Sequence, residues 1–215
     1  MPLLLADLDD TLLDRRGSFR DWAETFCTRH GFDADEVPWL VELDAYGYTS
    51  REEVFTRIRE RFYFAEPVDA LVAAYREEYP TFARPPSAEA VALLSGLRAR
   101  GWRIGVVTNG HPVQFRKLEV AGLDTLVDTC CVSELEGVRK PDPAIFERAA
   151  ERCGEPLAGA WMIGDNPQAD IGGAHALGLS TIWLRHGREW EEPAFAPTLA
   201  VDSLEAALAH LAELP

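Results

Sequence analysis

The sequence predicts an α/β fold in which helices cover both faces of a parallel sheet and a small helical domain interrupts the chain after the first strand. Short apolar runs alternate with stretches of helical length and period, which is typical of a parallel sheet buried on both faces. One long segment, residues 16–85, contains no such run and shows only helical patterns. At 215 residues, 47% of them hydrophobic, the chain is long enough for a core and a satellite domain.

The apolar runs give the expected strands, which are residues 2–8, 102–108, 126–132, 160–164, 180–184 and a last short one at 198–201. The expected helices between them are residues 87–100, 112–121, 142–153 and 168–177. Ser203 stands where an N-cap would start a C-terminal helix. These elements assign residues 1–15 and 86–215 to the sheet domain.

The inserted segment shows helical patterns near residues 18–30, 36–45, 50–62 and 67–80. It holds 14 of the 21 aromatic residues of the chain, which favours a helical bundle with its own core over an aromatic cage for a substrate. Pro85 and Pro86 end the segment, and neither can continue a helix, which favours a hinge back into the sheet domain.

The net charge and the cysteines exclude several classes of partner and site. A formal charge of -15 repels nucleic-acid backbones and anionic lipid, so no nucleic acid and no membrane is expected as a partner. The four cysteines form no CxxC pair, and the N-terminal apolar run is too short for a signal peptide. A reduced, cytoplasmic location is therefore expected, and the chain is expected to be a monomer or a homodimer.

Lysine is rare in this chain. Of 21 Lys and Arg residues, only Lys117 and Lys140 are lysines. A coding bias would explain the arginines, and each lysine then becomes a candidate for a role that arginine cannot fill. Lys117 lies in a helical pattern, however, and an exposed position is expected for it.

Polar residues gather where the expected strands end, at the edge where parallel sheets bind ligands. Asp7 and Asp9 stand where the first strand ends, Asp165 stands where the fourth apolar run ends, and Asp170 follows five residues later. Four carboxylates at one edge repel each other unless a cation joins them. Because their donors are all oxygen, the expected cation is Mg²⁺.

Further residues at the same edge could bind an anion. Thr108, Asn109 and Gly110 end the second run, where a hydroxyl and amide hydrogens at a helix start would bind phosphate oxygens. Lys140 opens the third helix of the sheet domain and would bring a positive charge to the nucleophile and the phosphate. The sequence therefore predicts a site for magnesium and phosphate.

The stretches DLDDTL, VVTNG, RKPDP and GDNPQAD resemble, in order, the four motifs of the haloacid dehalogenase (HAD) superfamily of hydrolases. The resemblance implies a Rossmann-like core at 1–15 and 86–215. It also implies a helical C1 cap at 16–85, because the family places such a cap after its first strand. The longer stretch TNGHPVQFRKL resembles the branch that contains pyrimidine nucleotidases and acylneuraminate-9-phosphatases.

The resemblance also implies roles for single residues. Asp7 would be the nucleophile that forms an aspartyl-phosphate, and Asp9 would be the general acid and base. Lys140 would be catalytic and would bind the phosphoryl group together with Thr108, Asn109 and Gly110. Mg²⁺ would be held by Asp7, the carbonyl of Asp9 and Asp165, and Asp170 would support these ligands or bind the metal through a water molecule.

Asp9 and the absence of lysine from the expected cap restrict the reactions that the family resemblance allows. Dehalogenases of this family lack the second aspartate, and phosphonatases use a cap lysine, whereas this chain has no lysine before Lys117. The expected function is that of a magnesium-dependent phosphatase acting on a small phosphorylated metabolite. A phosphomutase of the β-phosphoglucomutase type and a non-catalytic binding protein remain as alternatives.

Overall fold

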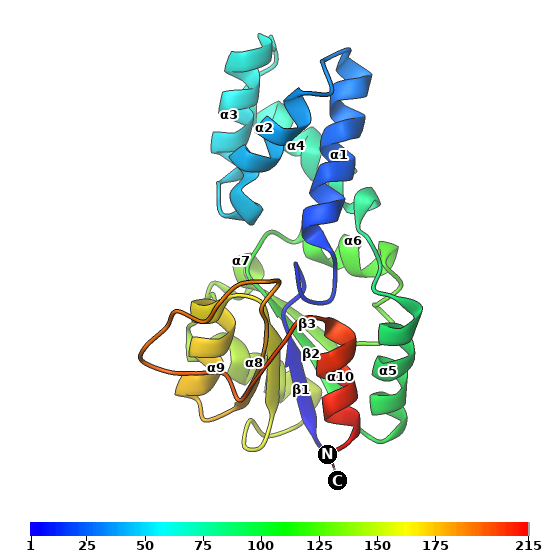
Figure 1. The fold of residues 1–215 in the computed structure, drawn as a ribbon, viewed down its shortest axis with the longest axis vertical. Helices are drawn as coiled ribbons and strands as arrows, with labels where there is room; N and C mark the ends of the chain where they lie inside the picture. The colour runs from blue at the N-terminus through cyan, green and yellow to red at the C-terminus, as the bar shows by residue number, and fades with distance from the viewer. Residues whose placement is uncertain (215) are drawn as a thin grey trace. The chain divides into compact units, whose positions relative to one another are not determined.

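The computed structural model describes residues 1–214. The chain forms two compact units (Figure 1). One unit consists of residues 1–13 together with the chain from residue 85 to its described end, and the other of residues 14–84. Each unit has a hydrophobic core of its own.

The first unit contains a six-stranded sheet, in which all neighbouring strands are parallel and the order is β3-β2-β1-β4-β5-β6. The strands are β1 (Leu3–Ala6), β2 (Arg103–Thr108), β3 (Thr129–Val132), β4 (Trp161–Gly164), β5 (Ser180–Leu184) and β6 (Leu199–Val201). The predicted parallel sheet is thereby confirmed. The chain adds β2 and β3 on one side of β1 and then crosses to β4 on the other. The switch point, where such sheets bind ligands, therefore lies between β1 and β4.

Helices cover both faces of this sheet, as its apolar strands require. They are α5 (Ala88–Ala99), α6 (Val113–Val120), α7 (Ser133–Glu136), α8 (Pro143–Cys153), α9 (Gly173–Ala176) and α10 (Leu204–Ala212). Leu3 and Leu5 on one face of β1 belong to the same core cluster as Phe146 of α8. Helices α5 and α10 pack against each other on the opposite face (Figure 1). Ser203 caps α10 as expected, since its hydroxyl accepts a hydrogen bond from the Ala206 amide at 3.2 Å.

The expected helix at 168–177 differs from the observed structure. The chain there forms a π-helical turn, η3 (Pro167–Gly172), followed by the short α9. Two side chains shape the turn: the Asn166 carboxamide oxygen accepts from the amide of Ala169 at 2.8 Å, and Asp170 accepts from the amide of Asn166 at 2.9 Å. A π-helical turn is wider than an α-helical one and is frequent at functional sites. This turn directs Asp170 back toward the end of β4.

The second unit contains four helices, α1 (Arg15–His30), α2 (Glu36–Asp44), α3 (Arg51–Phe62) and α4 (Val68–Glu78), with short 3₁₀ turns η1 (Ala45–Gly47) and η2 (Tyr79–Phe82). Its core is aromatic: Trp22 is 2% exposed, and its ring centroid lies 5.1 Å from that of Phe26 and 4.9 Å from that of Tyr75. Most of the aromatic residues here thus form the core of a helical bundle. Among residues 1–214, no helix is long and apolar enough to cross a membrane.

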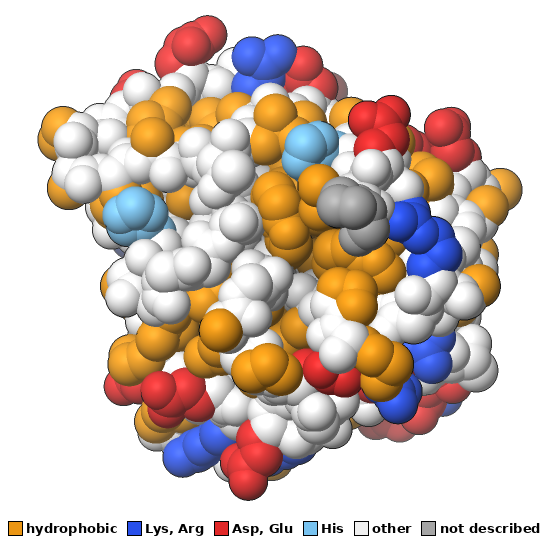
Figure 2. Space-filling model, turned by 90° about the horizontal axis from the view of Figure 1, so that it is seen from below, with side chains coloured by type: hydrophobic (Ala, Val, Ile, Leu, Met, Phe, Trp, Pro, Cys, Tyr) orange, Lys and Arg blue, Asp and Glu red, His pale blue; other side chains and the backbone are white. Residues whose placement is uncertain are grey.

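Figure 2 shows the molecule from the end at which β1 begins. Hydrophobic side chains gather in the middle of this face, and Asp and Glu lie mostly nearer its rim. The predicted site residues belong to the opposite edge of the sheet, because they follow the carboxyl ends of the strands.

Candidate active site

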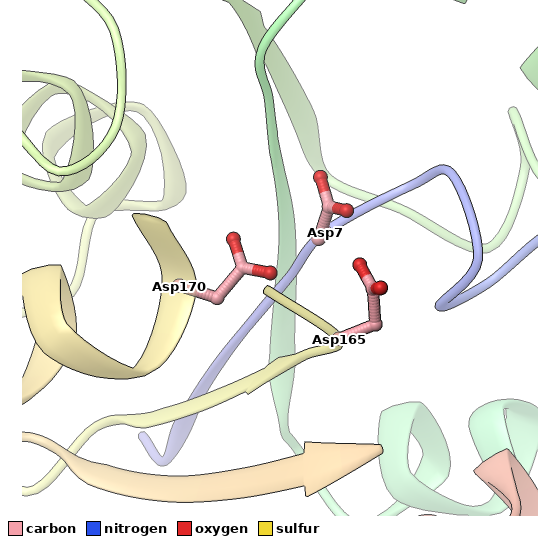
Figure 3. A group of neighbouring side chains, drawn as sticks. All are labelled: Asp7, Asp165 and Asp170. Carbon is pink, nitrogen blue, oxygen red and sulfur yellow. The ribbon is translucent and has the colours of Figure 1, made fainter. Parts of the chain in front are cut away.

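Three aspartates meet at the switch point (Figure 3). Asp7 follows β1, Asp165 follows β4 and Asp170 lies in η3, and one carboxylate oxygen from each lies within 4.8 Å of the others. The pairing of β1 with β4 continues into the site, since the Asp7 amide donates to the Ile163 carbonyl at 2.9 Å. We call these three residues the carboxylate cluster; each is at most 9% exposed.

Lys140 supplies a positive charge within the cluster. Its Nζ lies 2.6 Å from Asp7 Oδ1 and 2.7 Å from Asp170 Oδ1. Burial by itself would lower the pKa of Lys140, but the charges of Asp170 and Asp7 raise it above its ordinary value. Asn109 holds the backbone of Lys140 in place: its carboxamide accepts from the Lys140 amide at 2.8 Å and donates to the Lys140 carbonyl at 3.0 Å. The loop that carries Lys140 is therefore tied to the end of β2.

The cluster carries more negative charge than its ammonium group offsets. Burial raises the pKa of Asp7 to about 7, although Lys140 lowers it, and the charge of Asp170 raises it further. Burial, followed by the charges of Asp170 and Asp7, raises the pKa of Asp165 to about 8. Arg188 also contacts Asp165, donating to its carbonyl at 2.7 Å and to its Oδ2 at 3.2 Å. Buried carboxylate oxygens that lack charge compensation fit a hard divalent cation such as Mg²⁺.

These pKa values give the first testable prediction. A carboxyl whose pKa is higher in the folded than in the unfolded protein stabilises the fold at low pH and loses that contribution as the pH rises through the folded pKa. Metal-free protein is therefore expected to melt at lower temperatures as the pH rises from about 5 to about 8. Mg²⁺ bound at the cluster would compete with protons, so the stabilisation that it gives is expected to be largest at the alkaline end.

Thermal unfolding with a chelator and with excess Mg²⁺ across this pH range measures both effects. Asp165→Asn is the matched variant, because it removes one titrating carboxyl group of the cluster and should flatten the pH dependence and weaken the Mg²⁺ effect. A metal-free melting temperature that rises with pH in wild type, or an Mg²⁺ effect unchanged in Asp165→Asn, contradicts this description of the cluster.

Asp9 lies outside the carboxylate cluster and has its own partners. Both of its carboxylate oxygens accept hydrogen bonds from Lys117 Nζ, at 2.9 and 2.8 Å, and Oδ2 also accepts from Gln114 Nε2 at 3.0 Å. The expectation of an exposed Lys117 is wrong, since Lys117 is 6% exposed. Gln114 and Lys117 are three residues apart in α6 and share a face of the helix, which explains why both reach Asp9.

The three residues predicted to bind phosphate end β2 or follow it directly. Thr108 is buried, and its Oγ1 lies 2.8 Å from Gln114 Nε2. The Gly110 amide donates to Ser133 Oγ at 3.0 Å, so binding a phosphate oxygen would require it to exchange this bond. Asn109 acts on Lys140 through its side chain, as described above, and its predicted contact with phosphate through the backbone amide stays a prediction.

Gly164, the last residue of β4, must be glycine because Asp170 packs against its Cα. A Cβ at this position would lie 2.3 Å from Asp170 Oδ2 and 2.4 Å from Asp170 Cβ. Gly164→Ala is expected to displace Asp170 and to lower the free energy of unfolding by about 1–3 kcal/mol, the usual cost of overpacking. Urea unfolding measures this cost, with Gly96→Ala as control, since a Cβ there meets nothing within 4 Å. Equal stability of the two variants contradicts the close contact.

Some residues near the candidate site, at the carboxyl ends of the strands, could not be predicted from the sequence. The pairing of Gln114 and Lys117 with Asp9 was missed, although the rarity of lysine was a usable signal for Lys117. Arg188 follows β5 in a stretch without helical or strand pattern, and nothing in the sequence pointed to it. Ser133 starts the short α7 and likewise carried no signal.

Comparison with known proteins identifies the family. The family described as haloacid dehalogenase-like hydrolase matches residues 1–178. A phosphoserine phosphatase of Thermus thermophilus is 32% identical over 249 aligned positions, which cover 95% of this chain and 96% of the relative. A glyceraldehyde 3-phosphate phosphatase of Pyrococcus abyssi is 30% identical, with 86% of this chain and 82% of the relative covered.

A solved structure agrees with these relatives. The protein YfnB of Bacillus subtilis, crystallised bound to magnesium, is 26% identical, covers 99% of both chains and superposes with a TM-score of 0.78. The family resemblance read from the four motifs is thereby confirmed. With most of its length matched by the family and by relatives at 30% identity or more, this chain belongs to the haloacid dehalogenase-like hydrolases.

Proposed function

We propose that this protein is a magnesium-dependent phosphatase that hydrolyses a small phosphomonoester through a covalent intermediate on Asp7. The observation that carries the proposal is the buried Lys140 ammonium 2.6 Å from the Asp7 carboxylate, beside two further carboxylates at the switch point of the sheet. An ammonium there offsets negative charge on both the nucleophile and an incoming phosphate. The phosphatase names of the two relatives support the same reaction class.

The reaction proceeds in two displacements at phosphorus. In the first, a carboxylate oxygen of Asp7 forms a bond to phosphorus, the bond to the leaving oxygen breaks, and Asp9 gives that oxygen its proton. In the second, Asp9 takes a proton from water, the water oxygen bonds to phosphorus, and the bond to Asp7 breaks to release phosphate. Asp9 thus regains the proton it gave, and Asp7 its carboxylate.

The other residues of the site provide charge and orientation. Thr108 and the amide hydrogens of Asn109 and Gly110 bind oxygens of the phosphoryl group, and Lys140 offsets its charge. Mg²⁺ would be held by the carboxylate cluster and the Asp9 carbonyl, and when bound it would offset the negative charge that otherwise keeps a phosphate away. Such local cations are needed because the chain as a whole has a formal charge of -15.

The substrate class follows from the chemistry and from the relatives together. Phosphoserine and glyceraldehyde 3-phosphate, the substrates that the relatives' names give, are both small phosphomonoesters with an alkoxide leaving group. We propose the same class here and leave its member to experiment. We also propose that the unit of residues 14–84 is the cap that selects it.

Phosphate release from a panel of monophosphates in the presence of Mg²⁺ tests this function. The panel contains p-nitrophenyl phosphate, O-phosphoserine, glyceraldehyde 3-phosphate, sugar phosphates and pyrimidine nucleoside monophosphates. We expect release from several members and none after chelation of the metal. No release from any member, at a purity that excludes inhibition, contradicts the proposed phosphatase.

A further inference from the structure

The two lysines of this chain both lie at the candidate site, although they come from different elements. Lys140 precedes α8 and pairs with Asp7 and Asp170, whereas Lys117 lies in α6 and pairs with Asp9. The other 19 of the 21 Lys and Arg residues are arginines. A lysine ammonium is compact enough to approach a carboxylate in a confined space where the planar arginine head does not fit. Both lysines therefore stand where the size of the head group matters.

Helix α6 holds the Asp9 carboxylate through two side chains. Lys117 Nζ contacts both oxygens, at 2.9 and 2.8 Å, and Gln114 Nε2 contacts Oδ2 at 3.0 Å. The same Gln114 nitrogen lies 2.8 Å from Thr108 Oγ1. We call Gln114 and Lys117 the α6 clamp. It joins the residue that transfers protons to a residue that binds phosphate.

Burial shows that the clamp is built into the core and does not rest on the surface. Gln114 is 2% and Lys117 6% exposed. A buried ammonium costs free energy unless a partner offsets its desolvation, so a fold tolerates one only where its partner is fixed as well. The Asp9 side chain keeps 23% of its surface exposed, enough for contact with a substrate.

We infer that the α6 clamp positions Asp9 for proton transfer and that Lys117 thereby decides how well the enzyme cleaves esters with poor leaving groups. This inference rests on the proposed function. A carboxyl group with free torsions spends little time in the orientation in which, once protonated, it can pass its proton to a leaving oxygen, and the clamp removes that freedom. Lys117 is a positioning residue, because it acts on the substrate through the carboxyl group of Asp9.

Leaving-group chemistry separates this role from a general effect of charge. p-Nitrophenolate departs without a proton, whereas the alkoxide of O-phosphoserine or glycerol phosphate requires one. The ratio kcat/KM includes only steps up to the departure of the leaving group, and hydrolysis of the intermediate does not enter it. Lys117→Met is expected to lower kcat/KM for alkyl phosphates by about 100-fold more than for p-nitrophenyl phosphate, within the range of general acid catalysis.

Two further variants make the result specific. Arg116→Met removes a neighbouring positive charge from the same helix at a side chain that is 63% exposed, and it should leave the ratio between the two substrate types unchanged. Gln114→Glu keeps the size of the clamp but replaces its donor by a carboxylate that repels Asp9. Because Gln114 also contacts Thr108, a loss for all substrates should accompany this change, but the ratio of kcat/KM between alkyl phosphates and p-nitrophenyl phosphate should fall as in Lys117→Met. This ratio carries the test if Lys117→Met does not fold.

The outcomes also distinguish this inference from the proposed function. A selective loss in Lys117→Met or Gln114→Glu, with a wild-type ratio in Arg116→Met, supports the inference. An equal loss for all substrates, or no loss, in Lys117→Met overturns it while leaving the phosphatase intact, and Gln114→Glu decides in the same way where Lys117→Met does not fold. Absence of turnover in the wild type overturns the proposed function instead.

Discussion

Asp7→Asn is expected to lower kcat for every phosphomonoester by at least about 1,000-fold, as the loss of a covalent nucleophile does in other enzymes. A carboxamide cannot form the mixed anhydride with phosphate, although it matches the shape of the carboxylate. The fold should survive. Burial raises the pKa of Asp7 to about 7, which means that the charged carboxylate destabilises the metal-free protein, and a neutral carboxamide avoids this cost.

Steady-state assays with p-nitrophenyl phosphate and Mg²⁺ measure this effect, and a thermal melt checks the fold. Asp124→Asn, the same exchange at an exposed aspartate, is the matched control and should retain wild-type kcat. Turnover of Asp7→Asn within about tenfold of wild type contradicts a nucleophilic Asp7.

Lys140→Met is expected to affect both stability and activity, because it leaves Asp7 and Asp170 without their ammonium partner. Removing one partner of a buried ion pair typically lowers the free energy of unfolding by about 3–5 kcal/mol. The cost should be largest near pH 8, where Asp7 is charged, and smaller near pH 5, where its raised pKa of about 7 leaves it protonated. Mg²⁺ should restore part of the stability and little of the activity.

Urea unfolding at these two pH values, with a chelator or with Mg²⁺, measures the effect. Arg116→Met is the control, since an exposed ion pair contributes about 0–1 kcal/mol. A cost that is the same at both pH values, or no larger than that of the control, contradicts the charge balance described for the cluster.

The sheet could be predicted from the sequence because its strands are apolar on both faces. The run 102–108 predicted β2 (Arg103–Thr108) to within one residue, since residues 104–107 carry no polar side chain. The run 126–132 was longer than β3 (Thr129–Val132), because apolarity alone does not show where hydrogen bonding to a neighbouring strand starts. The expected helix at 168–177 failed in detail, because side-chain bonds of Asn166 and Asp170 widen the turn.

The site was predictable where its residues follow strands directly. Asp7 and Asp165 each follow a strand that could be recognised, and parallel strands bring their carboxyl ends to one edge. Lys117 could not be placed in this way, because a helical pattern does not tell which polar face turns inward. The rarity of lysine carried the missing information, and only the position of α6 beside Asp9 explains it.

The covalent intermediate on Asp7 is the central claim, and trapping it is the most direct measurement. Enzyme mixed with ³²P-labelled substrate and Mg²⁺ is quenched in acid within one turnover, digested at low pH and mapped by mass spectrometry. Asp9→Asn serves as a companion variant with labelled p-nitrophenyl phosphate, whose leaving group requires no proton, so the intermediate should form and, without the base, persist longer. We expect a phosphoryl group on the segment of residues 1–13, located at Asp7 and absent from Asp7→Asn. Phosphate release at the wild-type rate with no labelled protein, or with label at another residue, contradicts the claim.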